Sequence, residues 1–308
     1  MTLLVLEPGV QCTVQAAPRA GFRNAGVPAS GPADPLSMAL ANRLFGKPSG
    51  AACLEIAFGP ASFRATGDLQ VAVTGAIADL KAGGRTLPMH ATLSIAAGEI
   101  FEIGPARTGA RLYLAVAGNL QTQEFLSSAS TYLPAKFGGH EGRALQKGDV
   151  LQVSEASPVP QLTTPETLRL PPAAAYALRV VAGPDMQDSG DAFAKAVFHV
   201  TPRVSRMGVE IDGPFSALGA ASLRPSSAVF PGALQVTPQG RGFLLLPDGQ
   251  TTGGYPHVLQ VIRADRHLFG QFRPGDSVRF LLRTQAQAEE ALRAKQTLLQ
   301  SWLPDFRL

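Results

Sequence analysis

Short apolar runs separated by glycine and proline recur along the sequence. Between Leu3 and Val153 they read LLVLE, LQVAVTGA, ATLSIAAG, GARLYLAVAG and GDVLQVSE. Runs of about four to eight residues with turn residues between them are typical of strands in a barrel or sandwich. The 25 prolines and 32 glycines supply the many turns that such a fold needs. The sequence therefore predicts a mainly β protein.

A proline-rich stretch divides the sequence into two parts of similar character. Residues 156–177 contain five prolines, which interrupt any regular element. A chain of 308 residues also fits two domains of ordinary size. We therefore expect an N-terminal β-barrel-like domain over residues 1–155, a linker over 156–177 and a C-terminal domain over 178–308.

Helices are expected at three places. The best-defined one follows Asp34, a good N-cap residue, with Pro35 in the first helical position and Gly46 placed to end it. Another is expected near residues 188–198. The third ends the C-terminal domain, where apolar residues recur at helical spacing. Its apolar side comprises Ala288, Ala291, Leu292, Leu298, Leu299 and Trp302.

Charge and composition argue against several kinds of partner. The net charge is +4, but lysine and arginine are scattered and form no basic run, so no nucleic acid is expected. No apolar run approaches the roughly 18 residues of a membrane helix, and the first residues lack the basic leader of a secretion signal. Cys12 and Cys53 lie in apolar settings and imply no disulfide framework. We expect a cytoplasmic protein with no membrane partner.

The sequence signatures of several enzyme classes are missing. The five histidines show no paired spacing typical of a metal site, so no metal is expected. There is no GxSxG elbow, no GxxxxGK[ST] phosphate loop and no GxGxxG that opens a helix after a strand. The catalytic residues stay unassigned, and no intrinsic cofactor is expected.

One polar connection holds more hydrogen-bonding groups than a turn needs. DGQTTGGYP lies between two apolar runs, and a plain hairpin is the alternative interpretation. Glycines let a ligand approach backbone N–H groups, and hydroxyl, amide and phenol groups supply donors and acceptors. We expect this loop to bind a small polar ligand through Gln250, Thr251, Thr252, Gly253, Gly254 and Tyr255.

Three other segments are weaker candidates. Asp34 follows the glycines of GVPASGPADP and could place a helix N-terminus near an anion, although capping alone explains it; Asn42 and Glu55 share this ambiguity. Glu141 and Arg143 lie in KFGGHEGRALQKGD, which is equally consistent with an ordinary turn. Arg206 in VSRMG suits a carboxylate or phosphate, or an internal ion pair with Asp212 or Glu210.

Together, the motifs resemble those of a known family. GVPASGPADPLSMALANRLFG is followed in order by LEIAFGP, LYLAVAG, FGGHEGRALQKGD, SRMG, PGALQVTPQG, DGQTTGGYP and FRPGDSVRF. Over about residues 10–280 the chain is similar to the allophanate hydrolase subunit 2 family, which includes the 5-oxoprolinase C subunit (PxpC, KipA) and resembles the carboxyltransferase part of urea carboxylase. The resemblance implies two cyclophilin-like β-barrel halves with a few helices.

The resemblance also implies partners and an activity. It implies a KipI-like B subunit and an A subunit, which with this chain form an ATP-dependent 5-oxoprolinase that opens 5-oxoproline to glutamate. ATP would then be bound by the complex rather than by this chain, which would be inactive alone. The ligand would be a small polar amide or carboxylate, and donor-rich loops suit the oxyanion formed when the amide is activated by phosphorylation.

Two alternatives to the 5-oxoprolinase activity stay open. One is a KipA-like regulatory protein that sequesters a KipI-type kinase inhibitor, and the other is a carboxyltransferase-type component that acts on urea- or allophanate-like compounds. The chain departs from the family pattern at Ala16, Pro18, Ala129, Ser205 and Glu210, three of which replace charged residues outright and one of which reverses a charge. These altered motifs favour the regulatory alternative, whereas the intact DGQTTGGYP favours a ligand site.

Overall fold

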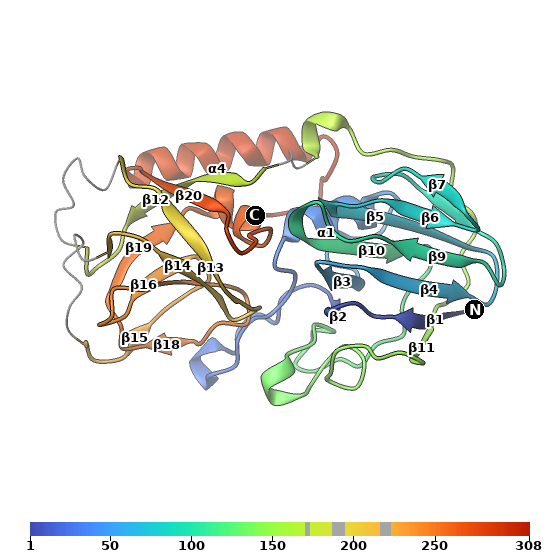
Figure 1. The fold of residues 1–308 in the computed structure, drawn as a ribbon, viewed down its shortest axis with the longest axis horizontal. Helices are drawn as coiled ribbons and strands as arrows, with labels where there is room; N and C mark the ends of the chain where they lie inside the picture. Colours follow the sequence, from blue (N-terminus) through green and yellow to red (C-terminus); the bar gives the residue numbers. More distant parts are fainter. Residues whose placement is uncertain (170–172, 187–194, 216–222) are drawn as a thin grey trace. The chain divides into compact units, whose positions relative to one another are not determined.

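The computed structural model describes residues 1–169, 173–186, 195–215 and 223–308. Its described elements are mostly β-strands, arranged in two compact units, which confirms the mainly β prediction (Figure 1). The first unit comprises Met1–Arg19, Ser30–Pro172 and Leu299–Arg307, and the second comprises Ala20–Ala29, Ala173–Leu298 and Leu308. No helix among the described residues is long and apolar enough to cross a membrane.

The first unit consists of two antiparallel sheets that share one core. One sheet has six strands, in the order β11 (Val150–Gln152), β1 (Thr2–Glu7), β4 (Ala61–Ala65), β9 (Ile100–Ile103), β6 (Leu80–Ala82) and β7 (Arg85–Leu87). The other has five strands, in the order β2 (Gln11–Gln15), β3 (Cys53–Ala57), β10 (Thr108–Val116), β5 (Leu69–Ile77) and β8 (Leu93–Ile95). The two sheets form a sandwich, which is one of the two arrangements that the apolar runs predicted.

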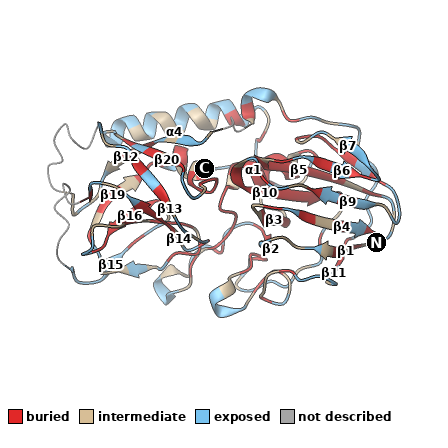
Figure 2. Cartoon of the chain, in the orientation of Figure 1, coloured by how far each residue is buried: buried red, intermediate tan, exposed pale blue. Residues whose placement is uncertain are grey.

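The core of this sandwich follows from alternation along the strands. In β9 the aromatic and aliphatic residues Phe101 and Ile103 are buried while Ile100 and Glu102 are exposed. Phe101 joins residues of both sheets, including Phe63, Leu112 and Val71, in one continuous apolar cluster. Figure 2 shows β3 and β10 almost wholly buried and β7 largely exposed. Burial of this cluster is the main stabilising contribution to the unit.

Helix α1 (Pro35–Arg43) covers the outer side of the five-stranded sheet. Asp34 caps it as predicted, since its carboxylate accepts the N–H of Ser37 at 3.0 Å. Pro35 is the first helical residue, and Gly46 has a φ of 64°, so the predicted end in the left-handed region is also confirmed. Met38 and Ala41 pack against Cys53, Tyr113 and Ala115. The remaining described helices of this unit are the short 3₁₀ turns η2 (Leu133–Ala135) and η3 (Glu166–Leu168).

The second unit is a closed barrel of seven strands. Their order is β12 (Ala175–Ala182), β19 (His257–Val261), β16 (Ala233–Val236), β17 (Gly242–Leu245), β14 (Gly208–Asp212), β13 (Phe198–Val204) and β20 (Ser277–Leu282). Strands β12 and β20 pair in parallel, and the other pairs are antiparallel. Aromatic rings help to fill the interior, where Phe198 lies 4.8 Å from Phe215 and 5.0 Å from Phe280 between ring centroids.

Smaller elements complete the second unit. A two-stranded sheet pairs β15 (Ser227–Ala228) with β18 (Thr252–Gly253). The helices are η1 (Arg23–Ala25), η5 (Arg263–Asp265), α3 (Arg266–Phe269) and α4 (Gln285–Gln300). The helix expected near residues 188–198 falls largely outside the described residues, and at its expected end Phe198 begins β13.

The C-terminal helix is confirmed, but its apolar side is narrower than predicted. Leu299 is its only fully buried residue, and Ala288, Ala291 and Leu292 are at most half-buried. Leu298, which was expected on the buried side, is 56% exposed. Leu298 and Leu299 are adjacent and point about 100° apart, so a single helix cannot bury both on one narrow face.

Each unit includes a segment that the predicted boundaries at 155 and 178 assigned to the other domain. Residues Ala20–Ala29 cluster with the second unit because Arg23 donates to the carbonyl of Val229 and lies over the Phe230 ring. Residues Leu299–Arg307 cluster with the first unit, where Ser49 donates its N–H and its hydroxyl to Asp305. Much of the expected linker also packs on the first unit, since Val159 donates to the Gln70 side chain at 2.8 Å. Such long-range contacts leave no periodic signal in a sequence.

Candidate functional site

A cavity of 1320 Å³ opens on the outer surface of the barrel. In β14, Val209 and Ile211 fill the barrel interior, so Glu210 and Asp212 alternate to the outside. The same alternation brings polar side chains of the neighbouring strands into this cavity. The side chains on which its chemistry depends are Thr201, Arg203, Glu210, Asp212, Gln235, Arg241, Phe243, Gln250 and Tyr255.

Two ion pairs form part of the cavity wall. Arg241 Nη1 lies 2.6 Å from Asp212 Oδ1, with both side chains about half exposed. Arg203 Nε lies 3.7 Å from Glu210 Oε2, which also accepts the Thr201 hydroxyl at 2.9 Å. The Arg203 side chain is 77% exposed, so its guanidinium keeps donors free for an anion entering the cavity.

A buried glutamine organises the polar end of the cavity. Gln235 is only 1% exposed, and its Nε2 donates to the carbonyl of Tyr255 at 2.9 Å. Its Oε1 accepts Gln250 Nε2 at 3.0 Å. These two bonds leave the Gln235 amide a single orientation and hold the Gln250 amide at the cavity.

Backbone hydrogen bonds hold the loop that carries Gln250. A Cβ on Gly253 would lie 2.5 Å from Gln235 Nε2, so any larger residue at this position would displace the Gln235 amide. Thr252 and Gly253 pair with β15, the carbonyl of Thr251 accepts Val229 N–H at 3.0 Å, and the carbonyl of Gly254 accepts Arg224 N–H. Of the six residues predicted in this loop, Gln250 and Tyr255 line the cavity, whereas Thr251, Thr252, Gly253 and Gly254 shape the loop.

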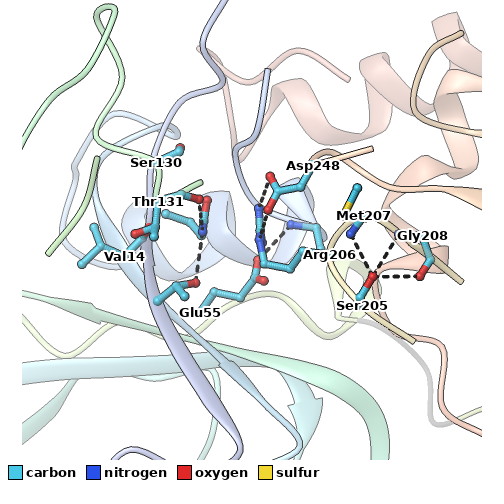
Figure 3. A network of polar contacts seen from close by, with 12 residues as sticks. Val14, Glu55, Ser130, Thr131, Ser205, Arg206, Met207, Gly208 and Asp248 are labelled. Atoms are coloured by element: carbon cyan, nitrogen blue, oxygen red, sulfur yellow. Dashed lines mark hydrogen bonds and ion pairs between the residues drawn. The ribbon is translucent and has the colours of Figure 1, made fainter. Parts of the chain in front are cut away.

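Arg206 lies beside this loop without lining the cavity. It is buried and pairs with Asp248, whose Oδ2 is 2.8 Å from Arg206 Nε (Figure 3). The expected internal partners were Asp212 or Glu210, but both line the cavity and pair with other arginines. Because Asp248 N–H also donates to the Arg206 carbonyl at 3.1 Å, this ion pair fixes the start of the loop. Ser205 beside it accepts the N–H groups of Met207 and Gly208 in a local turn.

The candidates Asp34 and Asn42 lie in the first unit. Both are fully buried. Asp34 accepts from the N–H and hydroxyl of Ser37, and Asn42 Nδ2 donates to the carbonyls of Ser49 and Ala51. Their polar groups are thus used in capping and in holding the chain after α1.

Glu55, which shared their ambiguity, belongs to a neighbouring buried network. Its Oε2 accepts the N–H of Ala33 at 2.9 Å and the hydroxyl of Tyr113 at 2.7 Å. Arg111 Nε lies 3.4 Å from its other oxygen. Burial, followed by the charges of Glu55 and Asp34, raises the pKa of Tyr113 well above its usual value, so the phenol stays a donor.

Glu141 and Arg143 form a self-contained turn of the first unit. Arg143 Nη1 lies 2.6 Å from Asp149 Oδ2, and Arg143 Nη2 lies 2.8 Å from Glu141 Oε2. The hydrogen bond from Arg143 lowers the pKa of Asp149 to about 2. The acid and base expected to contact a ligand are therefore paired with each other and with Asp149.

Other reactive groups offer little further chemistry. Cys12 and Cys53 are buried, and burial raises the pKa of both thiols, to about 12 for Cys53. Among the described residues, no three histidine, cysteine, aspartate or glutamate side chains lie together as metal ligands.

Sequence reasoning missed most of the cavity wall. Gln235, Arg203, Asp212, Arg241 and Phe243 were not among the expected site residues. Their signal is the polar or aromatic side chain that alternates with buried aliphatic residues, as in ALQV and GVEID. That pattern marks any half-exposed strand, and only the tertiary structure shows that side chains of these strands line one cavity.

The chain is similar to known proteins over most of its length. The family described as carboxyltransferase domain, subdomain A and B, matches residues 25–282. The C subunit of the Escherichia coli K12 5-oxoprolinase is 31% identical over 305 residues, covering 96% of this chain and 94% of that protein. The corresponding C subunit from Haemophilus influenzae is 28% identical, covering 90% of this chain and 89% of that protein.

A solved structure shows the same fold within a much longer chain. The urea amidolyase of K. lactis superposes with a TM-score of 0.89 at 26% identity, covering 98% of this chain. This chain spans only 20% of that protein. It is homologous to the 5-oxoprolinase C subunits and related to the carboxyltransferase domain of urea carboxylase. The chain therefore belongs to the carboxyltransferase domain, subdomain A and B, family.

Proposed function

We propose that this chain is the C subunit of an ATP-dependent 5-oxoprolinase and that its barrel cavity binds 5-oxoproline. Relatives named as the C subunits of 5-oxoprolinases, similar over almost the whole chain, support the assignment. The observation that supports the site is the Gln235–Gln250 amide pair, because it holds a primary amide in a fixed orientation at a polar cavity.

The cavity chemistry matches both polar ends of such a substrate. 5-Oxoproline carries a cyclic amide and a carboxylate. The Gln250 amide bonds Gln235 through one N–H, and its Oε1 has no partner among the described residues, so it can accept the lactam N–H. The guanidiniums of Arg203 and Arg241 face the same cavity and suit the carboxylate.

Ring opening needs more than this chain supplies. Hydrolysis breaks the lactam C–N bond, joins a hydroxyl from water to the carbonyl carbon and moves a proton to the leaving nitrogen. We infer that ATP, bound by the partner A and B subunits, transfers its γ-phosphoryl group to the amide oxygen and leaves as ADP. One water then adds to the activated carbon as the C–N bond breaks and the nitrogen takes up a proton, and a second water releases phosphate from the resulting acyl phosphate. Here, fixed amide and guanidinium donors orient the substrate and stabilise the developing oxyanion. The chain alone is then inactive.

Calorimetric titration of the assembled complex with 5-oxoproline tests this proposal. Gln250→Ala should weaken binding about tenfold, the effect of one lost hydrogen bond of about 1.4 kcal/mol. Gln152→Ala is the matched control, since Gln152 is exposed on β11 of the first unit. Binding that survives Gln250→Ala unchanged would place the substrate elsewhere, and a complex without ATP-dependent turnover would overturn the assigned reaction.

The structural similarity to urea amidolyase favours a second candidate. In that case the same cavity would take urea or an allophanate-like compound in carboxyl transfer. Titration of the complex with urea and with allophanate separates the two, because the first candidate predicts heat with 5-oxoproline but with neither of these ligands, and the second predicts the reverse. Tight association with the KipI-like B subunit but no heat from any of these ligands would instead support the regulatory, KipA-like function.

A further inference from the structure

A second cavity of the C-terminal unit, of 550 Å³, has a strongly cationic lining. It lies between α4 and the barrel, where α4 runs along β12 and β20 (Figure 1). Three arginines line it, Arg263, Arg266 and Arg283, against a single acid, Glu289. The cavity shares no lining residue with the substrate cavity proposed above.

Arg266 is the unusual member of this group. Its Nε is buried and has no hydrogen-bond partner among the described residues. Burial, and then the charge of Arg263, lowers its pKa to about 10. The adjacent acid, Asp265, is already paired with Arg179 at 2.6 Å. Arg266 is half-buried, and a cation shielded from water without a nearby anion is costly, so an anion bound from solution would stabilise it.

The other charged groups leave this cationic excess in place. Arg283 Nη1 donates to the carbonyl of Leu282, a bond that neutralises no charge, and Arg263 donates to a main-chain oxygen of Leu308. Glu289 is 54% exposed, accepts from Gln285 at 2.9 Å and lies 3.9 Å from Arg293. The N-terminus of α4 adds the positive end of its helix dipole at the same cavity.

We propose that this cavity binds a phosphate-bearing small molecule through Arg263, Arg266 and Arg283. Several guanidiniums around one site match the multiple oxygens and double charge of a phosphate group better than a single carboxylate. Val181, Ile262 and Leu292 supply an apolar wall for the organic part, and the volume lies in the range of about 300–1,000 Å³ typical of small-molecule sites. The site is separate from the 5-oxoproline cavity, and its proposal does not depend on that function.

Titration of the full chain with pyrophosphate, at ionic strength held constant with KCl, tests the site. Arg266→Met and Arg283→Gln should each weaken pyrophosphate binding at least tenfold. Arg279→Gln is the matched control. It removes the same charge as the other two substitutions, but Arg279 lies on β20, is exposed and does not line the cavity. Succinate carries two carboxylates where pyrophosphate carries two phosphates. It should bind at least tenfold more weakly than pyrophosphate.

Thermal unfolding without ligand separates a binding role from a structural one. If Arg266 is kept for a ligand, Arg266→Met keeps the apolar stem and leaves the unfolding temperature unchanged or raised. A lowered unfolding temperature for Arg266→Met, with unchanged pyrophosphate affinity in Arg283→Gln, would overturn the proposal. So would absence of pyrophosphate binding, equal weakening by Arg279→Gln, or equal affinity for succinate.

Discussion

The two units use the polar residues predicted as site residues in opposite ways. In the first unit, Asp34, Asn42 and Glu55 are buried, and their polar atoms bond the chain itself. In the second unit, Gln250 and Tyr255 are exposed at a cavity. This difference shows that a polar residue indicates a ligand site only where the fold does not already satisfy its hydrogen bonds.

The largest expected effect contrasts a buried acid of the first unit with an acid of the cavity wall. Glu55→Ala leaves Arg111 buried without its acid and should lower the free energy of unfolding by about 3–5 kcal/mol. Asp212→Ala breaks a half-exposed ion pair and should cost less than about 1 kcal/mol.

Urea unfolding of both variants measures this contrast. Glu102→Ala, at an exposed position of β9, is the control for loss of an acid in the first unit. Equal losses of unfolding free energy in Glu55→Ala and Asp212→Ala would contradict the difference between the two units.

A second prediction concerns a polar group of the first unit that is not fully satisfied. His90 is buried, its Nδ1 has no hydrogen-bond partner among the described residues, and burial, then Arg169, lowers its pKa to about 4. Between pH about 6.5 and 4 the unfolded chain therefore binds the proton that folded His90 excludes. The free energy of unfolding is therefore highest above about pH 6.5. It falls by about 3 kcal/mol in total as the pH drops from about 6.5 to about 4.

Urea unfolding at several pH values, followed by the fluorescence of Trp302, checks this prediction. Trp302 is the single tryptophan and belongs to the first unit. His90→Asn should flatten the pH dependence, and asparagine tolerates the φ of 59° at this position. A pH dependence that persists in His90→Asn contradicts the assignment to His90.

The smallest effect is expected at Glu141, which was a candidate ligand contact. Its side chain is 60% exposed and pairs with Arg143, so Glu141→Gln should change the free energy of unfolding by less than about 0.5 kcal/mol. The affinity of the complex for 5-oxoproline should not change. A loss of 5-oxoproline affinity as large as that expected for Gln250→Ala would instead show that this loop contributes to the substrate site.

Local features of the fold were predictable because neighbouring residues determine them. Strands followed from apolar alternation, α1 from Asp34 and Pro35, and α4 from its apolar spacing. The exchange of residues 20–29 and 299–307 was not predictable, because it depends on single contacts such as Arg23 with Val229 and Ser49 with Asp305. The cavity lining was also missed, since Gln235 and Arg241 come from strands whose curvature no local pattern records.

The mainly β character, the capped helix and the family resemblance could be predicted from the sequence, because they depend on residue order and short spacing. The tertiary structure alone decided which polar residues face a cavity. Arg206 and Gln250 are both polar residues of connections, yet one is buried against Asp248 and the other remains exposed. Whether a polar group is available to a ligand depends on the partners that folding brings to it, and those partners are distant in sequence.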